Sequence, residues 1–124
     1  MTRETAVATG RRFEALAADY LKVRGCRIED QNFRCKAGEI DLIVIDPESK
    51  LVFVEVRFRA SNRFGGAGAS VTAHKQNRIR NAAKIYLLTH REFKAHFCRF
   101  DVMALSHDKQ TNEIDVNWIK AAFV

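Results

Sequence analysis

The hydrophobic positions of this chain repeat with two different periods, which predict helices in some segments and strands in others. Over residues 3–24 the apolar positions follow the spacing i, i+3, i+4, i+7, i+8, and Gly25 follows as a helix stop signal. A second stripe of this kind predicts a helix over residues 71–90. The stripes consist of Phe13, Leu16, Ala17, Tyr20 and Leu21 in the first helix and Ile79, Ala82, Ala83, Tyr86 and Leu87 in the second.

Short apolar segments bounded by turn residues predict the strands. They cover residues 26–34, 39–46, 51–58, 97–105 and 113–119, and a basic, glycine-rich loop at residues 59–70 precedes the second helix. The order is therefore helix, three strands, helix, two strands. We expect a single α/β domain over residues 1–124, in which a mixed sheet is flanked by helices.

The second and third strands form a hairpin whose register decides where its carboxylates lie. Side chains alternate between the two faces of a strand, so Ile40 is expected on the face of Leu42 and Asp41 on the opposite face. If the turn consists of residues 47–49, Asp41 lies directly across from Glu55 on one face. A turn of two or four residues would place these two carboxylates on opposite faces.

Two neighbouring carboxylates on an apolar face need compensation, because their repulsion alone costs up to about 1 kcal/mol. A shared proton, a nearby cation or a bound metal ion would supply it. Arg57, expected opposite Glu39, offers an ordinary salt bridge as one explanation. The other is a hard divalent cation, Mg²⁺ or Mn²⁺, which prefers oxygen ligands and keeps positions open for phosphate.

Two helical residues are candidates to join this site. Glu14 borders the buried stripe of the first helix, although a solvated glutamate is the plain alternative. Lys75 shares the stripe of Ile79 and stands in the first helical turn, where the helix dipole disfavours a positive charge. Its plain alternative is a lysine whose methylene chain lies along the core edge while its ammonium group stays in water.

The charge of the chain is concentrated in one segment. Lysine and arginine number 21 against 15 aspartate and glutamate residues, yet residues 56–91 contain no acidic residue. The eight basic residues of this segment are Arg57, Arg59, Arg63, Lys75, Arg78, Arg80, Lys84 and Arg91. Such segregation attracts polyanions and favours nucleic acid as the partner over a merely solvated basic surface.

Other classes of protein fit the sequence poorly. No segment approaches the ~20 apolar residues that cross a bilayer, so no membrane association is expected. The N-terminal residues contain no apolar segment typical of a secretory signal. The cysteines Cys26, Cys35 and Cys98 are odd in number and form no CxxC pair, which argues against a disulfide framework or a zinc site and favours the reducing cytoplasm.

The segments GEIDLI at residues 38–43 and VFVEVR at residues 52–57 resemble the PD-(D/E)xK signature of the restriction-endonuclease-like superfamily. Nearly the full chain resembles the small bacterial YraN family within that superfamily, through Gly10 with Glu14, KQ at 75–76, RFDV at 99–102 and AF at 122–123. The resemblance implies an αβββαβ core and a metal-dependent phosphodiesterase site similar to that of archaeal Holliday-junction resolvases. It also implies a DNA partner and allows a homodimer.

Carried over to this sequence, the resemblance makes Asp41 and Glu55 metal ligands and Glu14 a supporting carboxylate. Ile40 replaces the motif proline, which is harmless because only the aspartate binds metal. Arg57 replaces the motif lysine, and an arginine stays charged, so it stabilises phosphate but does not deprotonate water. Either Lys75 takes over the lysine's role from the second helix, or the site binds nucleic acid without cutting it efficiently.

We therefore expect a Mg²⁺- or Mn²⁺-dependent endonuclease that acts on structured or branched DNA. In this hypothesis Arg57 and Lys75 neutralise developing charge, while Arg59, Arg63 and Arg78 contact backbone phosphates. The main alternative is a non-catalytic nucleic-acid-binding protein that retains the nuclease fold. A third is a protein-interaction subunit whose carboxylates are only structural.

Overall fold

The structure, a computed structural model, describes residues 6–59, 71–108 and 110–124, with side chains from residue 9 onward. Its elements follow the predicted order, with one additional short 3₁₀ helix, η2. Their bounds are α1 Ala6–Val23, β1 Arg27–Cys35, β2 Gly38–Ile45, β3 Leu51–Arg59, α2 Ala73–Thr89, η2 Arg91–Phe93, β4 Cys98–Asp108 and β5 Glu113–Phe123. The order predicted from the apolar periodicity, a helix, three strands, a helix and two strands, is thus confirmed, and it contains the αβββαβ core that the resemblance implies.

The strands form one five-stranded mixed sheet in the order β1-β2-β3-β4-β5. Neighbouring strands are antiparallel except β3 and β4, which are parallel and are joined by the crossover that contains α2. A parallel pair needs such a long connection, because a tight turn can join only antiparallel neighbours. The fold class is the expected mixed α/β sheet flanked by helices.

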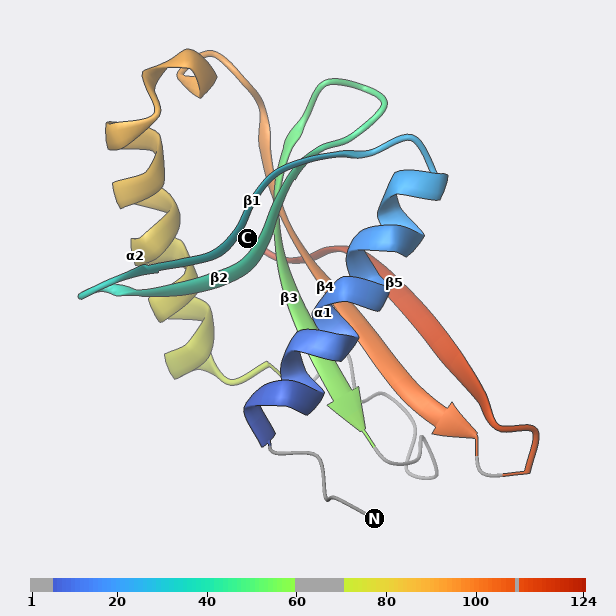
Figure 1. The fold of residues 1–124 in the computed structure, drawn as a ribbon. Helices are drawn as coiled ribbons and strands as arrows, with labels where there is room; N and C mark the ends of the chain where they lie inside the picture. Colours follow the sequence, from blue (N-terminus) through green and yellow to red (C-terminus); the bar gives the residue numbers. More distant parts are fainter. Residues whose placement is uncertain (1–5, 60–70, 109) are drawn as a thin grey trace.

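The helices cover opposite faces of the sheet, so the buried side chains form two clusters (Figure 1). The cluster beneath α1 includes Phe13, Ala17, Leu21, Leu42, Val44, Val52, Val54, Met103 and Leu105. The cluster beneath α2 includes Ile40, Ile43, Leu51, Phe53, Ile79, Ala82, Ala83, Tyr86 and Val102. Both helical stripes predicted from the sequence therefore contribute to the core, although Leu16 at the edge of the first remains 38% exposed.

Local signals set the helix ends that matter for the site. Gly25 ends α1 with φ +89°, and the Cys26 N–H donates to the Leu21 carbonyl at 3.0 Å, an arrangement that favours glycine. Thr72 caps α2 through its hydroxyl, which accepts from the Lys75 N–H at 3.1 Å. This cap places Lys75 in the first turn of α2, where the sequence predicted it.

A buried polar network that sequence analysis did not identify joins the turn after β2 to β4 and β5. Asp101 is fully buried and accepts hydrogen bonds from Arg99, from the Trp118 indole and from the Ala121 N–H, at 2.8 to 3.0 Å. Arg99 also donates to Asp46 at 3.0 Å. Because each partner is paired, the network is expected to hold this end of the sheet together.

Candidate functional site

The β2–β3 hairpin has the register that places the candidate carboxylates together. The turn consists of residues 47–49, with the Asp46 N–H donating to the Lys50 carbonyl at 3.0 Å. Ile45 pairs with Leu51, and the register continues to Leu42 opposite Val54. The pairing ends there, one residue before the predicted pair of Asp41 with Glu55.

Asp41 lies where the pairing of β2 with β3 ends. The Val56 N–H of β3 donates to Asp41 Oδ2 at 2.8 Å. This hydrogen bond to a side chain links the two strands beyond the last main-chain pair, Leu42 with Val54. The carboxyl group of Asp41 is also within hydrogen-bonding reach of Glu55. The predicted neighbourhood of the two carboxylates is confirmed.

Packing against α2 explains why the strands separate here. In Figure 1 the β1–β2 hairpin turns toward α2 while β3 continues in its own direction. Gly38, the first residue of β2, lies so close to α2 that an added Cβ would be 2.1 Å from the Arg78 carbonyl oxygen. Only glycine permits this approach, and the pairing of β2 with β3 does not extend to the start of β2.

The expected position of Ile40 is wrong. Simple alternation places it with Leu42 beneath α1, but it packs in the cluster beneath α2. Alternation relative to β3 holds only while the two strands run side by side. Beyond Leu42 the β1–β2 hairpin turns toward α2, and this movement takes Ile40 into the α2 cluster.

Lys75 reaches the carboxylates from the first turn of α2. Its Nζ atom lies 2.6 Å from Glu55 Oε1, and the Glu55 side chain is only 4% exposed whereas that of Lys75 is 49% exposed. A buried carboxylate paired with a half-exposed, flexible cation keeps its charge compensated while leaving the cation free to move. The expectation that Lys75 points toward the carboxylates is confirmed.

The two carboxyl groups disfavour each other's ionised form. Burial raises the pKa of Asp41 to about 6, although the hydrogen bond from the Val56 N–H opposes the increase. Burial and the neighbouring Asp41 raise the pKa of Glu55 to about 7, against the opposing effect of Lys75. The pair therefore retains a proton at a higher pH than two separate carboxyl groups would.

Glu14 brings a third carboxylate from α1. Its negative charge contributes to the raised pKa of Asp41, which places Glu14 close enough to act on that group. Within the described part of the chain, Glu14 Oε2 is a buried oxygen without a hydrogen-bond partner. A buried carboxylate oxygen of this kind is costly unless something else binds it.

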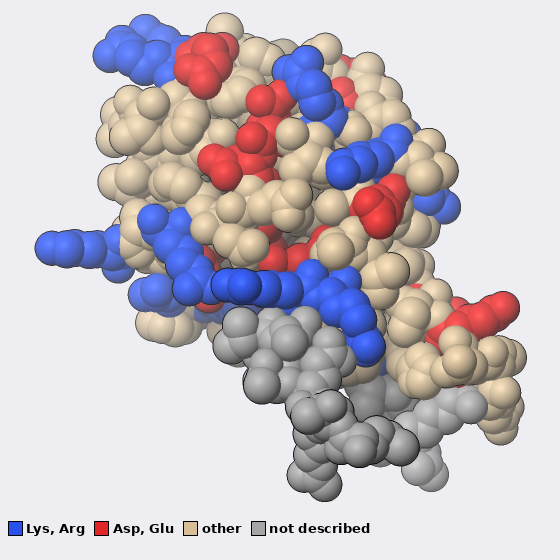
Figure 2. Space-filling view, viewed as in Figure 1, with Lys and Arg blue, Asp and Glu red and all other residues tan. Residues whose placement is uncertain are grey.

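The basic candidates other than Lys75 lie on the same two elements, β3 and α2, and differ in exposure. Arg57 is half-buried on β3, two residues after Glu55, and Arg59 is exposed at the end of the strand. Arg78 is exposed on α2, three residues after Lys75. Arg63 lies outside the described residues. Figure 2 shows basic side chains gathered in a band across the lower part of the face drawn, beside acidic side chains.

The candidate carboxylates can be compared with what a divalent metal ion requires. As placed, the described side chains form no group of three or more His, Cys, Asp or Glu residues that could hold a metal ion. Even so, the nearby oxygen donors of Asp41, Glu55 and Glu14 are of the type that Mg²⁺ and Mn²⁺ prefer. The unpartnered Glu14 Oε2 is an observation that such an ion would explain.

The described helices include none with the length and apolar character needed to span a bilayer.

Residues 13–105 match uncharacterised protein family UPF0102. A UPF0102 protein of Alcanivorax borkumensis is 47% identical over 93% of this chain and 90% of its own length. Similar proteins occur in Stutzerimonas stutzeri, 41% identical over 94% of both chains, and in Pseudomonas syringae pv. syringae, 42% identical over 99% of this chain and 98% of the relative. The chain therefore belongs to the uncharacterised protein family UPF0102.

Proposed function

We propose that this protein binds nucleic acid and hydrolyses phosphodiester bonds in structured or branched DNA, with Mg²⁺ or Mn²⁺ as its cofactor. The observation that carries the proposal is the placement of Asp41 beside Glu55, with Lys75 bonded to Glu55, where β2 separates from β3. Asp41 and Glu55 correspond to the acids of the PD-(D/E)xK signature that the chain resembles. They support its assignment to the restriction-endonuclease-like superfamily, with a site similar to that of junction resolvases.

Asp41 and Glu55 are the proposed metal ligands, and Glu14 is the supporting carboxylate. The chemistry that a divalent ion supplies when bound is polarisation of a phosphate oxygen and a lowered pKa of a nearby water. The burial of the ligands supports this role, because two neighbouring buried carboxylates disfavour each other's ionised form and a cation would relieve this. In the metal-free protein, Lys75 supplies part of that positive charge.

Lys75 and Arg57 are proposed to act on the phosphate. The ammonium group of Lys75 is on a half-exposed side chain and can move from Glu55 to a phosphate oxygen. Arg57 follows Glu55 by two residues on β3, so the two share a strand face. Because its guanidinium group stays protonated, Arg57 stabilises negative charge and takes no proton.

The remaining basic residues are proposed to position the DNA backbone. Arg59 and Arg78 are exposed on the two elements that bear Glu55 and Lys75. Contacts of this type hold a strand in place without reading its sequence. Arg63, from the same basic segment of the sequence, is proposed to join them.

Cleavage assays with defined DNA substrates test this proposal. A four-way junction, a flap and a linear duplex would be incubated with Mg²⁺ or Mn²⁺ and with the variants Asp41→Asn and Glu55→Gln. We expect metal-dependent cleavage, strongest on the branched substrates, and at least a hundredfold loss in both variants. The control is Asp19→Asn, an exposed acid on α1 that makes the same charge change.

Metal binding is measured separately by titration calorimetry with Mn²⁺. We expect binding by the natural protein and by Asp19→Asn, and none by Asp41→Asn. Metal-dependent cleavage that survives both site substitutions, or equal Mn²⁺ binding by all variants, would contradict the proposed site.

The alternative is a non-catalytic nucleic-acid-binding protein that retains this fold. The specific observation in its favour is Arg57, because the resembling signature has a lysine there and arginine does not accept a proton at neutral pH. DNA binding without cleavage of any of the three substrates, with either metal, would favour this alternative. In that case Lys75 acts only as the counter-ion of Glu55.

A further inference from the structure

A pocket of about 500 Å³ lies at the other end of α2, away from the carboxylates. Its lining residues are Lys84, Leu87, Leu88, Arg91 and Lys94. Lys75 and Leu88 are thirteen residues apart, so the pocket is ~20 Å along the helix from the candidate site. A molecule bound here would leave the carboxylates accessible.

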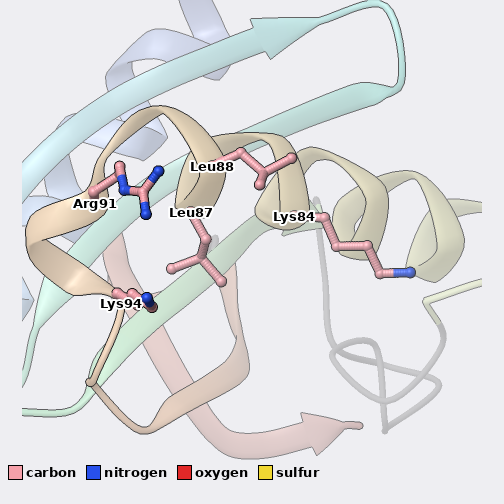
Figure 3. A pocket seen from close by; sticks show the side chains of 5 residues that line it. All are labelled: Lys84, Leu87, Leu88, Arg91 and Lys94. Atoms are coloured by element: carbon pink, nitrogen blue, oxygen red, sulfur yellow. The ribbon is translucent and has the colours of Figure 1, made fainter.

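The pocket has an apolar centre and a positive rim. Figure 3 shows the two leucines between Lys84 on one side and Arg91 and Lys94 on the other. Leu87 packs partly against the α2 core cluster, whereas Leu88 is 72% exposed. The centre thus offers a fixed wall and one exposed leucine to an incoming apolar group.

The three rim cations have no ion pair with another described residue. Lys84 lies on α2, whereas Arg91 and Lys94 lie in and just after η2, so the cations stand on two sides of the leucines (Figure 3). Carboxylates of a partner would therefore meet cations that are not already neutralised. A partner with acidic groups around an apolar side chain would satisfy both parts of the pocket.

We propose that this pocket binds an acidic peptide segment of a partner protein through an apolar side chain that enters between Leu87 and Leu88. The carboxylates of the segment then pair with Lys84, Arg91 and Lys94. A second copy of this chain fits less well, because its net charge of +6 repels the basic rim. Nucleic acid would use the cations but has no apolar group suited to the leucines.

Fluorescence anisotropy with a labelled peptide of four aspartates followed by leucine and phenylalanine tests the proposal. Two comparison peptides replace the two apolar residues by alanine or the four aspartates by serine. We expect binding of the first peptide, and at least about tenfold weaker binding of each comparison peptide. Equal binding of the alanine peptide would overturn the proposal, because it would show general attraction to a basic surface.

Variants of the full chain locate the binding. Leu88→Ser and Arg91→Glu should each weaken peptide binding about tenfold, whereas Lys22→Glu, an exposed control on α1 with the same charge change, should not. Circular dichroism would confirm that Leu88→Ser, which alters an exposed side chain, remains folded. Unchanged peptide binding in folded Leu88→Ser would overturn the proposal.

A labelled oligonucleotide and anionic lipid vesicles provide the remaining outcomes. We expect neither to lose affinity in Leu88→Ser. Loss of oligonucleotide or vesicle binding in this variant, with no peptide binding by the natural protein, would assign the pocket to nucleic acid or lipid instead. DNA cleavage by Leu88→Ser should match the natural protein, so failure of this proposal is distinct from failure of the nuclease proposal.

Discussion

At the scale of single residues, the candidate site consists of charges that destabilise the fold unless something neutralises them. Glu55 is almost fully buried, Asp41 is its neighbour, and Glu14, whose charge raises the pKa of Asp41, has a buried oxygen without a hydrogen-bond partner among the described residues. Lys75, half exposed, forms an ion pair with Glu55. Proteins retain such arrangements where function requires them, because a neutral replacement is usually more stable.

We predict that Asp41→Asn stabilises the metal-free protein at neutral and higher pH. Because the pKa of Asp41 is raised in the folded state, folding disfavours its ionised form, and stability falls as the pH rises from the ordinary carboxyl range through about 7. The gain in the free energy of unfolding should be about 1–2 kcal/mol at pH values above about 7, and it should be absent at pH values below the ordinary carboxyl range. Asparagine can still accept the Val56 N–H hydrogen bond.

Urea denaturation with EDTA at several pH values would measure this effect. The exposed residue in Asp19→Asn provides the control and should change stability by less than about 0.5 kcal/mol. A loss of stability in Asp41→Asn at high pH would show that the carboxylate is compensated in the fold.

The second prediction concerns Arg57, which stands at the position of the motif lysine, and Lys75, which is proposed to take over that lysine's role. Lys75→Ala should abolish metal-dependent cleavage in the natural protein, because Glu55 and the phosphate lose the mobile ammonium group. In an Arg57→Lys background the same substitution should cost less, since a lysine on β3 restores the motif arrangement. The coupling in a double-mutant cycle should be about 0.5–3 kcal/mol.

Cleavage rates of the four proteins on one branched substrate give the cycle. Arg57→Lys alone should preserve or increase the rate. Additive losses would show that Lys75 does not share a role with Arg57, and the non-catalytic alternative would then be favoured.

At the scale of elements, local patterns predicted most of the molecule and long-range packing decided the rest. The two helical stripes, the Gly25 stop and the hairpin register followed from periodicity and turn length, so Asp41 could be matched to Glu55 without a structure. Ile40 could not be placed in this way, because the divergence of β2 depends on contact with α2, which is distant in sequence. The hydrogen bond from the Trp118 indole to Asp101 also joins residues that are distant in sequence, so no local pattern predicts it. Only the bond from Arg99 to Asp101, two positions apart on the same strand face, could be expected from the sequence.

The divergence of β2 leads to the third prediction. Gly38→Ala should destabilise the fold by about 1–3 kcal/mol, because the added methyl group would collide with the Arg78 carbonyl oxygen on the backbone of α2. Moving the hairpin away from α2 would also separate Asp41 from Lys75. Mn²⁺ affinity and cleavage should therefore fall together with stability.

Gly10→Ala is the matched control for this substitution. Gly10 lies within α1, and an added Cβ would have nothing within 4 Å. This change should stabilise the protein by about 0.5–1 kcal/mol, because alanine favours the helix. Thermal denaturation of both variants provides the comparison. Unchanged stability of Gly38→Ala would show that α2 can shift to accommodate the methyl group at little cost.

At the scale of the whole molecule, α2 connects two different positively charged surfaces. Its first turn brings Lys75 to Glu55, with Arg78 exposed one turn later, and its C-terminal half forms, with Arg91 and Lys94 of the following segment, the pocket that Lys84 also lines. Most of these cations come from the segment without acidic residues that was identified in the sequence. The surfaces differ in chemistry, since the second surrounds two leucines, and they should therefore respond differently to salt.

The final prediction separates these surfaces through the salt dependence of DNA binding. Replacing Arg59 and Arg78 together by glutamine should reduce the slope of log affinity against log salt by about 2 at most, because each lost phosphate contact releases about one counterion fewer. Lys84→Gln with Arg91→Gln removes the same charge from the pocket rim and should leave the slope unchanged. Equal reductions in both double variants would mean that DNA follows the full length of α2, and the acidic peptide would then compete with DNA for the pocket.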